Sequence, residues 1–308
     1  MRLGVLDIGS NTVHLLVCDV VAGSAPIPAF SLKEPLGLIG HLTEEGSFDS
    51  AMVKDLSRVV TDLTSAAKAN GCIETLAFAT SAVREATNGQ KVLDQVISKT
   101  KQDISVLSGA DEARLTFLAT RRWFGWSSGT LLNLDIGGGS FELAIGSGEL
   151  PDKAMSLPLG AGRLTKDFKL SDPPTAKQLN QLNEYIYNQI ESVIDQITTE
   201  EGADHVVGTS KTFRSLARIA GAAPSAEGPF VKRILPADKL PQIVRKVAAM
   251  SANERTSLPG VSKHRAVQLA AGAMVAAAAV DLLDIEEIEI SPWALREGIL
   301  SRHIDSLR

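Results

Sequence analysis

The chain has 308 residues, of which 44% are hydrophobic and 22% are charged, and its formal net charge at pH 7 is −5. This length and composition predict a compact protein of about two domains. The net negative charge argues against general nucleic-acid binding, so a polyanionic substrate would need a local cluster of donors and a bound cation.

Targeting and redox patterns are weak in this sequence. Residues 1–5 lead directly into an apolar strand without a signal-peptide pattern, so we expect a cytoplasmic protein. The alanine-rich stretch 266–283 is too weakly hydrophobic for a membrane span and predicts a buried helix. Cys18 and Cys72 lie in apolar surroundings, which favours buried thiols in a reducing compartment over a disulfide. Metal-binding Cys and His spacings are missing, so we expect no zinc site.

The first half of the chain alternates predicted strands and helices. Strands are expected over 3–8, 13–20, 25–33, 74–79 and 104–107, and helices over 49–70, 89–101 and 108–123. A short helix that carries Arg84 is expected to be capped by Thr80 or Ser81. The first two strands should form a hairpin.

The second half repeats this plan after a polar, glycine-bearing link at 125–129. Strands are expected over 130–135, 140–146, 153–157, 205–208 and 286–290, and helices over 176–199, from 212, over 237–250 and 263–283, and from 293. Alternating elements indicate an α/β protein, and hairpins indicate mixed sheets. We place the domains at 1–126 and 127–293, with the last helix, about 294–308, packing on the first domain.

Two acidic glycine turns stand out. Apolar strands end in Asp7 and in Asp135, and the turns that follow contain Gly9, Ser10, Asn11 and Thr12, and Gly137, Gly138, Gly139 and Ser140. One aspartate after a strand is commonly a turn cap. Two such sites favour paired carboxylates that hold a hard divalent cation or position water, and Mg²⁺ fits because it binds few carboxylates and bridges to phosphates.

Backbone N–H groups in such turns can form nests that bind anions, and the hydroxyls add donors. Three consecutive glycines between strands cost conformational entropy, which favours a binding role over a flexible loop. Neither turn is a Walker A loop, because no Gly-Lys-Ser/Thr closes it. A third glycine turn, 208–212, contains Ser210 and Lys211 and can be a helix cap or a further phosphate or nucleotide contact.

Other charged residues carry no local signal. Glu112 can be an acid at a helix start, and Arg84 can lie on a solvated helix face. Local spacing does not decide between these alternatives and a functional role. The histidines are scattered, and we expect them to be structural: His14, His41, His205, His264 and His303.

Five segments, in this order and spacing, resemble the exopolyphosphatase / guanosine pentaphosphate phosphatase family within the actin-like and sugar-kinase-like ATPase superfamily. They are DIGSNT at 7–12, SAVREA at 81–86, SGADEAR at 108–114, DIGGGS at 135–140 and LREG at 295–298. The resemblance covers essentially the whole chain. It implies two ribonuclease-H-like (actin-like ATPase) domains with mixed sheets and an active-site cleft between the domains.

The resemblance also implies roles for individual residues. Glu112 would be the general base, and Asp135 with Asp7 would hold Mg²⁺ or the water network, with Glu112 as a third candidate metal ligand. Arg84 and the glycine turns would bind phosphates. Such hydrolysis needs an aligned water, a base and neutralisation of phosphoryl charge. A monovalent cation such as K⁺ is a further candidate cofactor, and a homodimer is common in the family.

We therefore expect an exopolyphosphatase that releases terminal orthophosphate from inorganic polyphosphate with Mg²⁺. The sequence ends soon after segment 295–298, where long members continue, so we expect a short form that favours short chains. Conversion of guanosine pentaphosphate (pppGpp) to the tetraphosphate (ppGpp) is the main alternative. A sugar or acyl kinase and a non-catalytic polyphosphate or (p)ppGpp sensor are further alternatives. Lys211 replaces the glycine or alanine usual in the family, and its role stays open.

Overall fold

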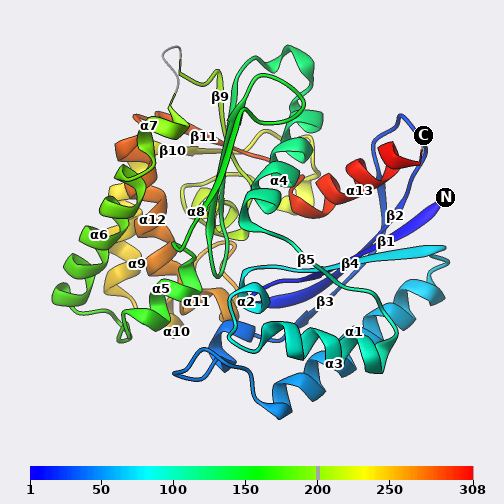
Figure 1. Cartoon of the computed structure of the whole chain (residues 1–308). Helices are drawn as coiled ribbons and strands as arrows, with labels where there is room; N and C mark the ends of the chain where they lie inside the picture. The colour runs from blue at the N-terminus through cyan, green and yellow to red at the C-terminus, as the bar shows by residue number, and fades with distance from the viewer. Residues whose placement is uncertain (199–201, 308) are drawn as a thin grey trace. The chain divides into compact units, whose positions relative to one another are not determined.

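The computed structural model describes residues 1–198 and 202–307 (Figure 1). The chain separates into two compact units. Unit 1 comprises Met1–Leu115 and Leu295–Arg308, and unit 2 comprises Thr116–Ala294. The division at Leu115 falls inside a helix, whereas we had placed the domain limit at 126/127, and that limit stays a prediction.

Unit 1 is built on a five-stranded mixed sheet in the order β3-β2-β1-β4-β5. The first three strands are antiparallel neighbours, and β1, β4 and β5 are parallel. The expected hairpin around the first glycine turn is therefore present. The strands are β1 (Arg2–Ile8), β2 (Thr12–Asp19), β3 (Ile27–Pro35), β4 (Glu74–Ala79) and β5 (Ser105–Val106).

Helices cover both faces of this sheet (Figure 1). Leu6 and Ile8 of β1 belong to the core under α1 and α3, whereas Leu3 and Val5 belong to the core that contains α13 residues. Because side chains alternate along a strand, Asp7 shares the α13 face with Leu3 and Val5. The helices of this unit are η1 (Leu38–His41), α1 (Ser50–Ala69), α2 (Ser81–Arg84), α3 (Gly89–Thr100), the start of α4 (Gly109–Phe124) and α13 (Leu295–Ser306).

Helix caps in unit 1 follow the sequence with one exception. Asp49 caps α1 by accepting a hydrogen bond from Met52 N at 2.8 Å, and Gly71 follows the helix with a φ of 79°. Neither Thr80 nor Ser81 caps α2, so that prediction was wrong: Thr80 occupies the cap position without a side-chain bond. The Ser81 hydroxyl instead pairs with Ser10, as described below.

Unit 2 is built on a six-stranded mixed sheet in the order β10-β11-β9-β6-β7-β8. The antiparallel meander β6-β7-β8 surrounds the second glycine turn, as expected, and β9 lies parallel to both β6 and β11. The strands are β6 (Leu131–Ile136), β7 (Phe141–Gly146), β8 (Lys153–Leu157), β9 (His205–Gly208), β10 (Ile234–Pro236) and β11 (Glu287–Ile290).

Helix α12 lies at the centre of the helical layer of unit 2. It contacts α5, α6, α8 and α9, and nearly all of its side chains are buried, which confirms a buried helix in the alanine-rich stretch. No helix in the described ranges has the length and apolarity that a membrane crossing requires. The helices are η2 (Trp126–Ser128), α5 (Ala161–Asp167), α6 (Ala176–Glu191), α7 (Ile194–Ile197), α8 (Lys211–Ile219), η3 (Ser225–Glu227), η4 (Ala237–Lys239), α9 (Leu240–Ala249), α10 (Ala252–Arg255), α11 (Lys263–Ala266) and α12 (Leu269–Leu282).

Two long predicted helices are each interrupted. The helix expected over 176–199 ends at Glu191 and resumes as α7, because Val193 N bonds to Ile190 O, three residues earlier, and breaks the α pattern. Its expected end, Thr199, lies outside the described residues. The helix expected over 263–283 divides into α11 and α12 around Gln268. The apolar spacing continues across each break, so periodicity alone could not reveal it.

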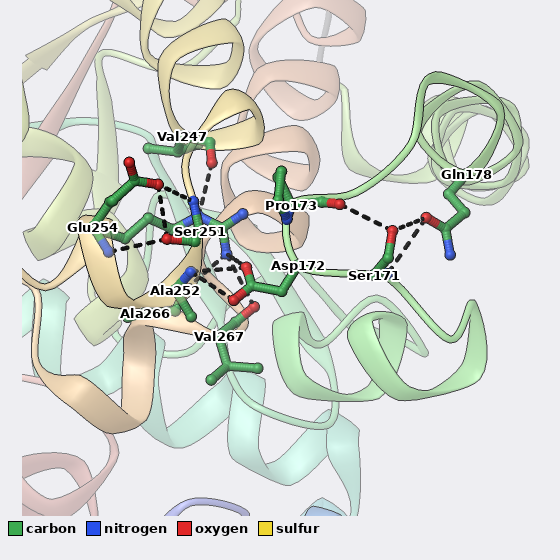
Figure 2. A network of polar contacts seen from close by, with 11 residues as sticks. Ser171, Asp172, Pro173, Gln178, Val247, Ser251, Ala252, Glu254, Ala266 and Val267 are labelled. Carbon is green, nitrogen blue, oxygen red and sulfur yellow. Dashed lines mark hydrogen bonds and ion pairs between the residues drawn. The ribbon is translucent and has the colours of Figure 1, made fainter.

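A buried arginine connects several helices of unit 2. Arg255, 1% exposed, donates from Nε to Val247 O at 2.7 Å and from Nη1 to Ala266 O, the last residue of α11, at 3.0 Å. Asp172 lies 3.7 Å from the same Nη1 and accepts hydrogen bonds from Ala252 N at the start of α10 (Figure 2). This network fixes the position of α11, which carries a residue of the candidate site.

The two cysteines are free thiols, of which Cys18 is buried and Cys72 is half-buried. The prediction of two buried thiols was therefore wrong for Cys72, which lies in the turn between α1 and β4 rather than within a sheet strand. Burial raises the pKa of the Cys18 thiol to about 12, so this side chain behaves as a core residue.

Candidate active site

In unit 1, Asp7 forms an ion pair with Arg296. Asp7 Oδ2 accepts a hydrogen bond from Arg296 Nη1 at 2.9 Å, and both side chains are largely buried. Helix α13 can bring Arg296 here because Gly298 packs directly on the Leu115 carbonyl of α4, where a Cβ atom would overlap that oxygen. Burial raises the pKa of the Asp7 carboxyl, and the Arg296 guanidinium opposes this shift.

His14 lies opposite Asp7 on the neighbouring strand β2. Its Nε2 lies 2.7 Å from the Ser31 hydroxyl of β3. Burial, with the positive charges of Arg296 and Lys33, lowers the pKa of His14 to about 2. The imidazole is therefore neutral at physiological pH and packs beside Asp7 as an uncharged hydrogen-bonding group.

The first glycine turn is anchored on both sides. Gly9 N donates to Thr12 O at 3.1 Å, and Asn11 O accepts from the backbone N of Leu36 and Gly37 at 3.2 and 2.9 Å. The buried Ser10 hydroxyl lies 3.0 Å from the hydroxyl of Ser81, at the start of the helix that carries Arg84. These bonds place the turn and α2 in fixed relation, which is the geometry that an anion-binding turn requires.

Glu112 and Arg84 form an ion pair, with Arg84 Nη1 donating to Glu112 Oε1. The same nitrogen donates to Leu107 O at 2.8 Å, so the guanidinium is held from two sides. Glu112 is 8% exposed and lies in the first turn of α4. The hydroxyl of Ser108 caps that turn by accepting from Asp111 N at 3.1 Å.

In unit 2, Asp135 Oδ2 accepts a hydrogen bond from the Thr209 hydroxyl at 2.5 Å. Thr209 follows β9, which lies parallel to β6, so the two strand ends meet at the same edge of the sheet. Arg265 of α11 interacts electrostatically with Asp135; burial lowers the pKa of this guanidinium and the carboxylate opposes that shift. The Arg255 network described above therefore helps to hold Arg265 at this carboxylate.

Glu142 lies directly opposite Asp135 in the antiparallel pair β6-β7. It is buried and accepts a hydrogen bond from the Ser156 hydroxyl of β8 at 2.8 Å. Opposed residues of an antiparallel pair present their side chains on the same face. Two carboxylates thus share this face of the sheet, and the sequence reasoning had not selected Glu142.

The second glycine turn is tightly packed. Gly137 N donates to Ser140 O at 2.9 Å, and the carbonyls of Gly137 and Gly138 accept from Ala161 N and Arg163 N at the start of α5, at 3.0 and 2.9 Å. Gly160 lies against the backbone of Gly139 and Ser140, where a Cβ atom would overlap main-chain atoms. This close approach explains why glycine is required at position 160.

In the third turn, Ser210 acts as the helix cap. Its hydroxyl accepts from Phe213 N at 3.3 Å at the start of α8, so the capping alternative describes this residue. Lys211, the first residue of α8, has an exposed side chain. Thr212 donates its hydroxyl to Ile136 O at 2.9 Å, which ties α8 to the strand that carries Asp135.

The structure therefore assembles two sets of predicted residues, one in each unit. Unit 1 contains Asp7, Arg84, Glu112 and the turn Gly9, Ser10, Asn11 and Thr12; unit 2 contains Asp135, Ser210, Lys211 and the turn Gly137, Gly138, Gly139 and Ser140. Sequence reasoning assigned no role to Arg296, Arg265, Thr209 or Glu142. Only Glu142 had a local signal, because it lies at the strand position opposite an aspartate across a hairpin turn.

The fit of a divalent metal differs between these carboxylates. No group of three or more His, Cys, Asp or Glu side chains with metal-binding geometry occurs among residues 1–198 and 202–307. In unit 2, Asp135 and Glu142 offer hard oxygen donors on one face, which suits Mg²⁺ with water and phosphate oxygens as its other ligands. In unit 1, Asp7 and Glu112 each already face an arginine.

Comparison with known proteins agrees with these features. A model of the Ppx/GppA phosphatase family matches residues 16–307. The chain is 47% identical over 306 residues to exopolyphosphatase 1 of Mycobacterium leprae, covering 99% of this chain and 90% of that protein. It is 28% identical to a guanosine-5'-triphosphate,3'-diphosphate pyrophosphatase of Vibrio parahaemolyticus, covering 98% of this chain and 59% of that protein.

Solved structures share the fold. A crystal structure of an exopolyphosphatase from Cytophaga hutchinsonii has a TM-score of 0.89 at 25% identity and covers 100% of this chain and 99% of that one. The Aquifex aeolicus member of the Ppx/GppA family has a TM-score of 0.82 at 22% identity, with the same shares of the two chains covered. The expected two-domain, actin-like α/β fold with mixed sheets is confirmed. The chain belongs to the Ppx/GppA phosphatase family.

Proposed function

We propose that this phosphatase is an exopolyphosphatase, which hydrolyses the terminal phosphoanhydride of inorganic polyphosphate and releases orthophosphate. The observation that carries the proposal is the Arg84–Glu112 pair. It places a buried carboxylate, which can accept a proton, beside a guanidinium, which can bind phosphate oxygens. The relative at 47% identity, named exopolyphosphatase 1, supports this substrate.

In this proposal Glu112 accepts a proton from water while the water oxygen attacks the terminal phosphorus. The P–O bond to the rest of the chain breaks, and the bridging oxygen leaves with the shortened polyphosphate. Arg84 binds oxygens of the transferred phosphoryl group, whose charge must be stabilised in the transition state. The glycine turns in each unit present backbone N–H groups to the remaining phosphates.

Mg²⁺ is the cofactor we propose, held by Asp135 with Glu142 as its neighbour. When bound, it would neutralise phosphate charge and orient the chain. Thr209 donates to Asp135 Oδ2 and so fixes the orientation of that carboxylate. A metal role for Asp7 and Glu112 stays a prediction, and the Arg296 pair favours a positioning role for Asp7. The homodimer, a monovalent cation and a cytoplasmic location are likewise carried forward as predictions.

A side-by-side assay tests the substrate. The purified protein is given Mg²⁺ with either inorganic polyphosphate or guanosine pentaphosphate, and phosphate release is followed. We expect a higher kcat/KM on polyphosphate. Release from guanosine pentaphosphate alone would instead support the alternative, which the Vibrio relative represents. Transfer of phosphate from ATP to a small acceptor would support a kinase.

A further inference from the structure

A pocket of about 460 Å³ in unit 2 lies beside the start of α8 and shares only Lys211 with the candidate-site residues named above, among the residues that the structure describes. Four basic side chains line it: Lys211, Arg214, Arg218 and Arg233. Within the described residues its lining contains no aspartate or glutamate, and small residues such as alanine, glycine and proline form most of the remaining wall. The pocket is therefore a concave site with strong positive charge.

Backbone carbonyls hold the arginines in place. Arg214 Nη2 donates to Ser291 O and Pro292 O, each at 3.0 Å, and Arg218 Nη1 donates to Ala222 O. Arg233 donates to carbonyls at four positions of the same loop: Ala223, Pro224, Gly228 and Val231. A carbonyl oxygen orients a guanidinium but carries no formal charge.

The positive charges of two of these arginines, Arg218 and Arg233, can therefore interact with a bound anion. In the part of the chain that the structure describes, neither Arg218 nor Arg233 forms an ion pair with a carboxylate. A positive charge held in fixed orientation costs little ordering when an anion binds. Arg233 uses four of its five N–H donors on carbonyls and so contributes mainly charge, whereas the Arg218 guanidinium can also donate to phosphate oxygens. Phosphate is the ligand chemistry that this arrangement fits.

The third turn connects this pocket to the candidate active site. Thr209 donates to Asp135 Oδ2 at 2.5 Å, and Lys211, two residues further along, lines the pocket. A phosphate chain whose reacting end lies at Asp135 can therefore run along the start of α8 toward the four cations.

We propose that this pocket is a distal subsite that binds phosphate groups of the polyphosphate chain away from its reacting end. The inference rests on the proposed function, because it names where the rest of that substrate binds. It assigns Lys211 the role of a donor at the entrance to the subsite. Catalytic efficiency should then rise with chain length until the chain reaches the pocket, and level off beyond that length.

The test compares wild type with Arg218→Gln on inorganic polyphosphates of increasing length, from tripolyphosphate upward. Glutamine can still donate to Ala222 O but carries no charge. We expect kcat/KM on the longer chains to fall about tenfold, mainly through KM, with a change on tripolyphosphate within about twofold, since a charge-assisted hydrogen bond is lost only where phosphate reaches it. Arg218→Lys should restore most of the loss.

Arg245→Gln is the matched control, because Arg245 is exposed on α9 and does not line the pocket. Its kinetics should equal those of wild type at every length. The proposal is overturned if Arg218→Gln changes kcat/KM by the same factor at all chain lengths, changes it at none, or affects only guanosine pentaphosphate. Circular dichroism and urea unfolding of each variant identify a loss that comes from misfolding.

A binding measurement separates this proposal from the proposed function. Binding of long-chain polyphosphate to the wild-type protein is measured by titration calorimetry, which detects binding whether or not the protein hydrolyses the chain. If the wild type released no phosphate but bound polyphosphate in a way that Arg218→Gln weakened about tenfold, the proposed function would fail and the subsite would stand. Phosphate release with binding that is unchanged in Arg218→Gln would leave the function in place and remove the subsite.

Discussion

Asp7 and Arg296, separated by 289 residues in sequence, are joined by a hydrogen-bonded ion pair of 2.9 Å. The pair links the last helix of the chain, α13, to its first strand, β1. Helix α13 can lie this close because Gly298 packs on the Leu115 carbonyl. Leu115 lies one turn after Glu112 on α4. Helix α13 therefore supports both the first glycine turn and the helix that carries the proposed base.

The first prediction concerns this ion pair. Arg296→Gln leaves a largely buried carboxylate without its cation, so the free energy of unfolding in urea should fall by about 1–3 kcal/mol. This loss is smaller than that expected for a fully buried pair, because both side chains keep some exposure to solvent. Arg302→Gln, on the exposed side of α13, is the control and should change it by less than about 0.5 kcal/mol.

A double-mutant cycle with Asp7→Asn measures the coupling directly. We expect the double variant to be less destabilised than the sum of the two single variants by at least about 1 kcal/mol. Additive effects would show that the two side chains do not stabilise each other, and would argue against a positioning role for Asp7.

The second prediction concerns pH and His14. The pKa of His14 is lowered to about 2 in the folded protein, whereas the unfolded chain takes up this proton near pH 6.5. Below pH 6.5 the unfolded state thus binds more protons than the folded state. As the pH is lowered, the free energy of unfolding therefore decreases by up to about 1.4 kcal/mol per pH unit. Above pH 6.5 the residue gives no pH dependence.

His14→Gln should remove this slope while keeping a hydrogen-bonding group near Ser31. Between pH 6.5 and pH 5, wild type should lose about 2 kcal/mol more than the variant, measured by urea unfolding at each pH. His41→Gln, at an exposed position, should behave as wild type. Equal pH dependence in wild type and His14→Gln would contradict the buried, neutral state of this imidazole.

The third prediction concerns the Thr209 hydroxyl that donates a hydrogen bond to Asp135. Thr209→Val keeps the side-chain shape but removes the bond to Oδ2. If that bond orients a metal-binding carboxylate, the Mg²⁺ concentration that gives half-maximal activity should rise about 10- to 100-fold. Thr212→Val is the matched control, because it removes a similar bond to a backbone carbonyl, Ile136 O, instead. A similar Mg²⁺ response in both variants would show that the Thr209 bond is only structural.

Much of the fold could be predicted because its signals are local. Short apolar runs identified most strands, and Asp49 and Gly71 marked the ends of α1. The two glycine turns were recognisable because the same Asp-Ile-Gly sequence occurs at Asp7 and at Asp135. Interrupted helices were not recognisable. In the break after Glu191, Val193 N and Gln196 N each bond to a carbonyl three residues earlier, while the apolar spacing stays intact.

The candidate site could be predicted only in part. Asp7 and Asp135 were selected from their own segments, but their partners Arg296 and Thr209 come from distant parts of the chain. Nothing in the local sequence near Arg296 or Arg265 indicates which carboxylate it faces, because that depends on how helices pack on the sheet. Glu112 and Arg84 needed the family resemblance, and the structure adds that they pair with each other.

The fourth prediction concerns the close approach at the second glycine turn. Gly160→Ala would place a methyl group against the backbone of Gly139 and Ser140, which cannot move as a flexible side chain would. The free energy of unfolding should fall by about 1–3 kcal/mol or more, with a loss of phosphate release as the turn is displaced. Thermal and urea unfolding give the first quantity.

Gly148→Ala is the control for this variant. A Cβ atom at Gly148 would lie 3.5 Å from Leu150 O, an ordinary contact distance. This variant should change the free energy of unfolding by less than about 1 kcal/mol. A loss of equal size at both positions would show that the packing of Gly160 on the turn has no special importance.

The most direct measurement of the account is phosphate release from inorganic polyphosphate by wild type, Glu112→Gln and the matched neighbour Asp111→Asn, with Mg²⁺. We predict that wild type releases orthophosphate as the only small product and that Glu112→Gln loses at least about 100-fold in kcat while it still binds polyphosphate. Asp111→Asn, whose half-exposed side chain pairs with Arg114 in the first turn of α4, should stay within about threefold of wild type. Near-normal turnover by Glu112→Gln, or no orthophosphate from wild type, would contradict the account.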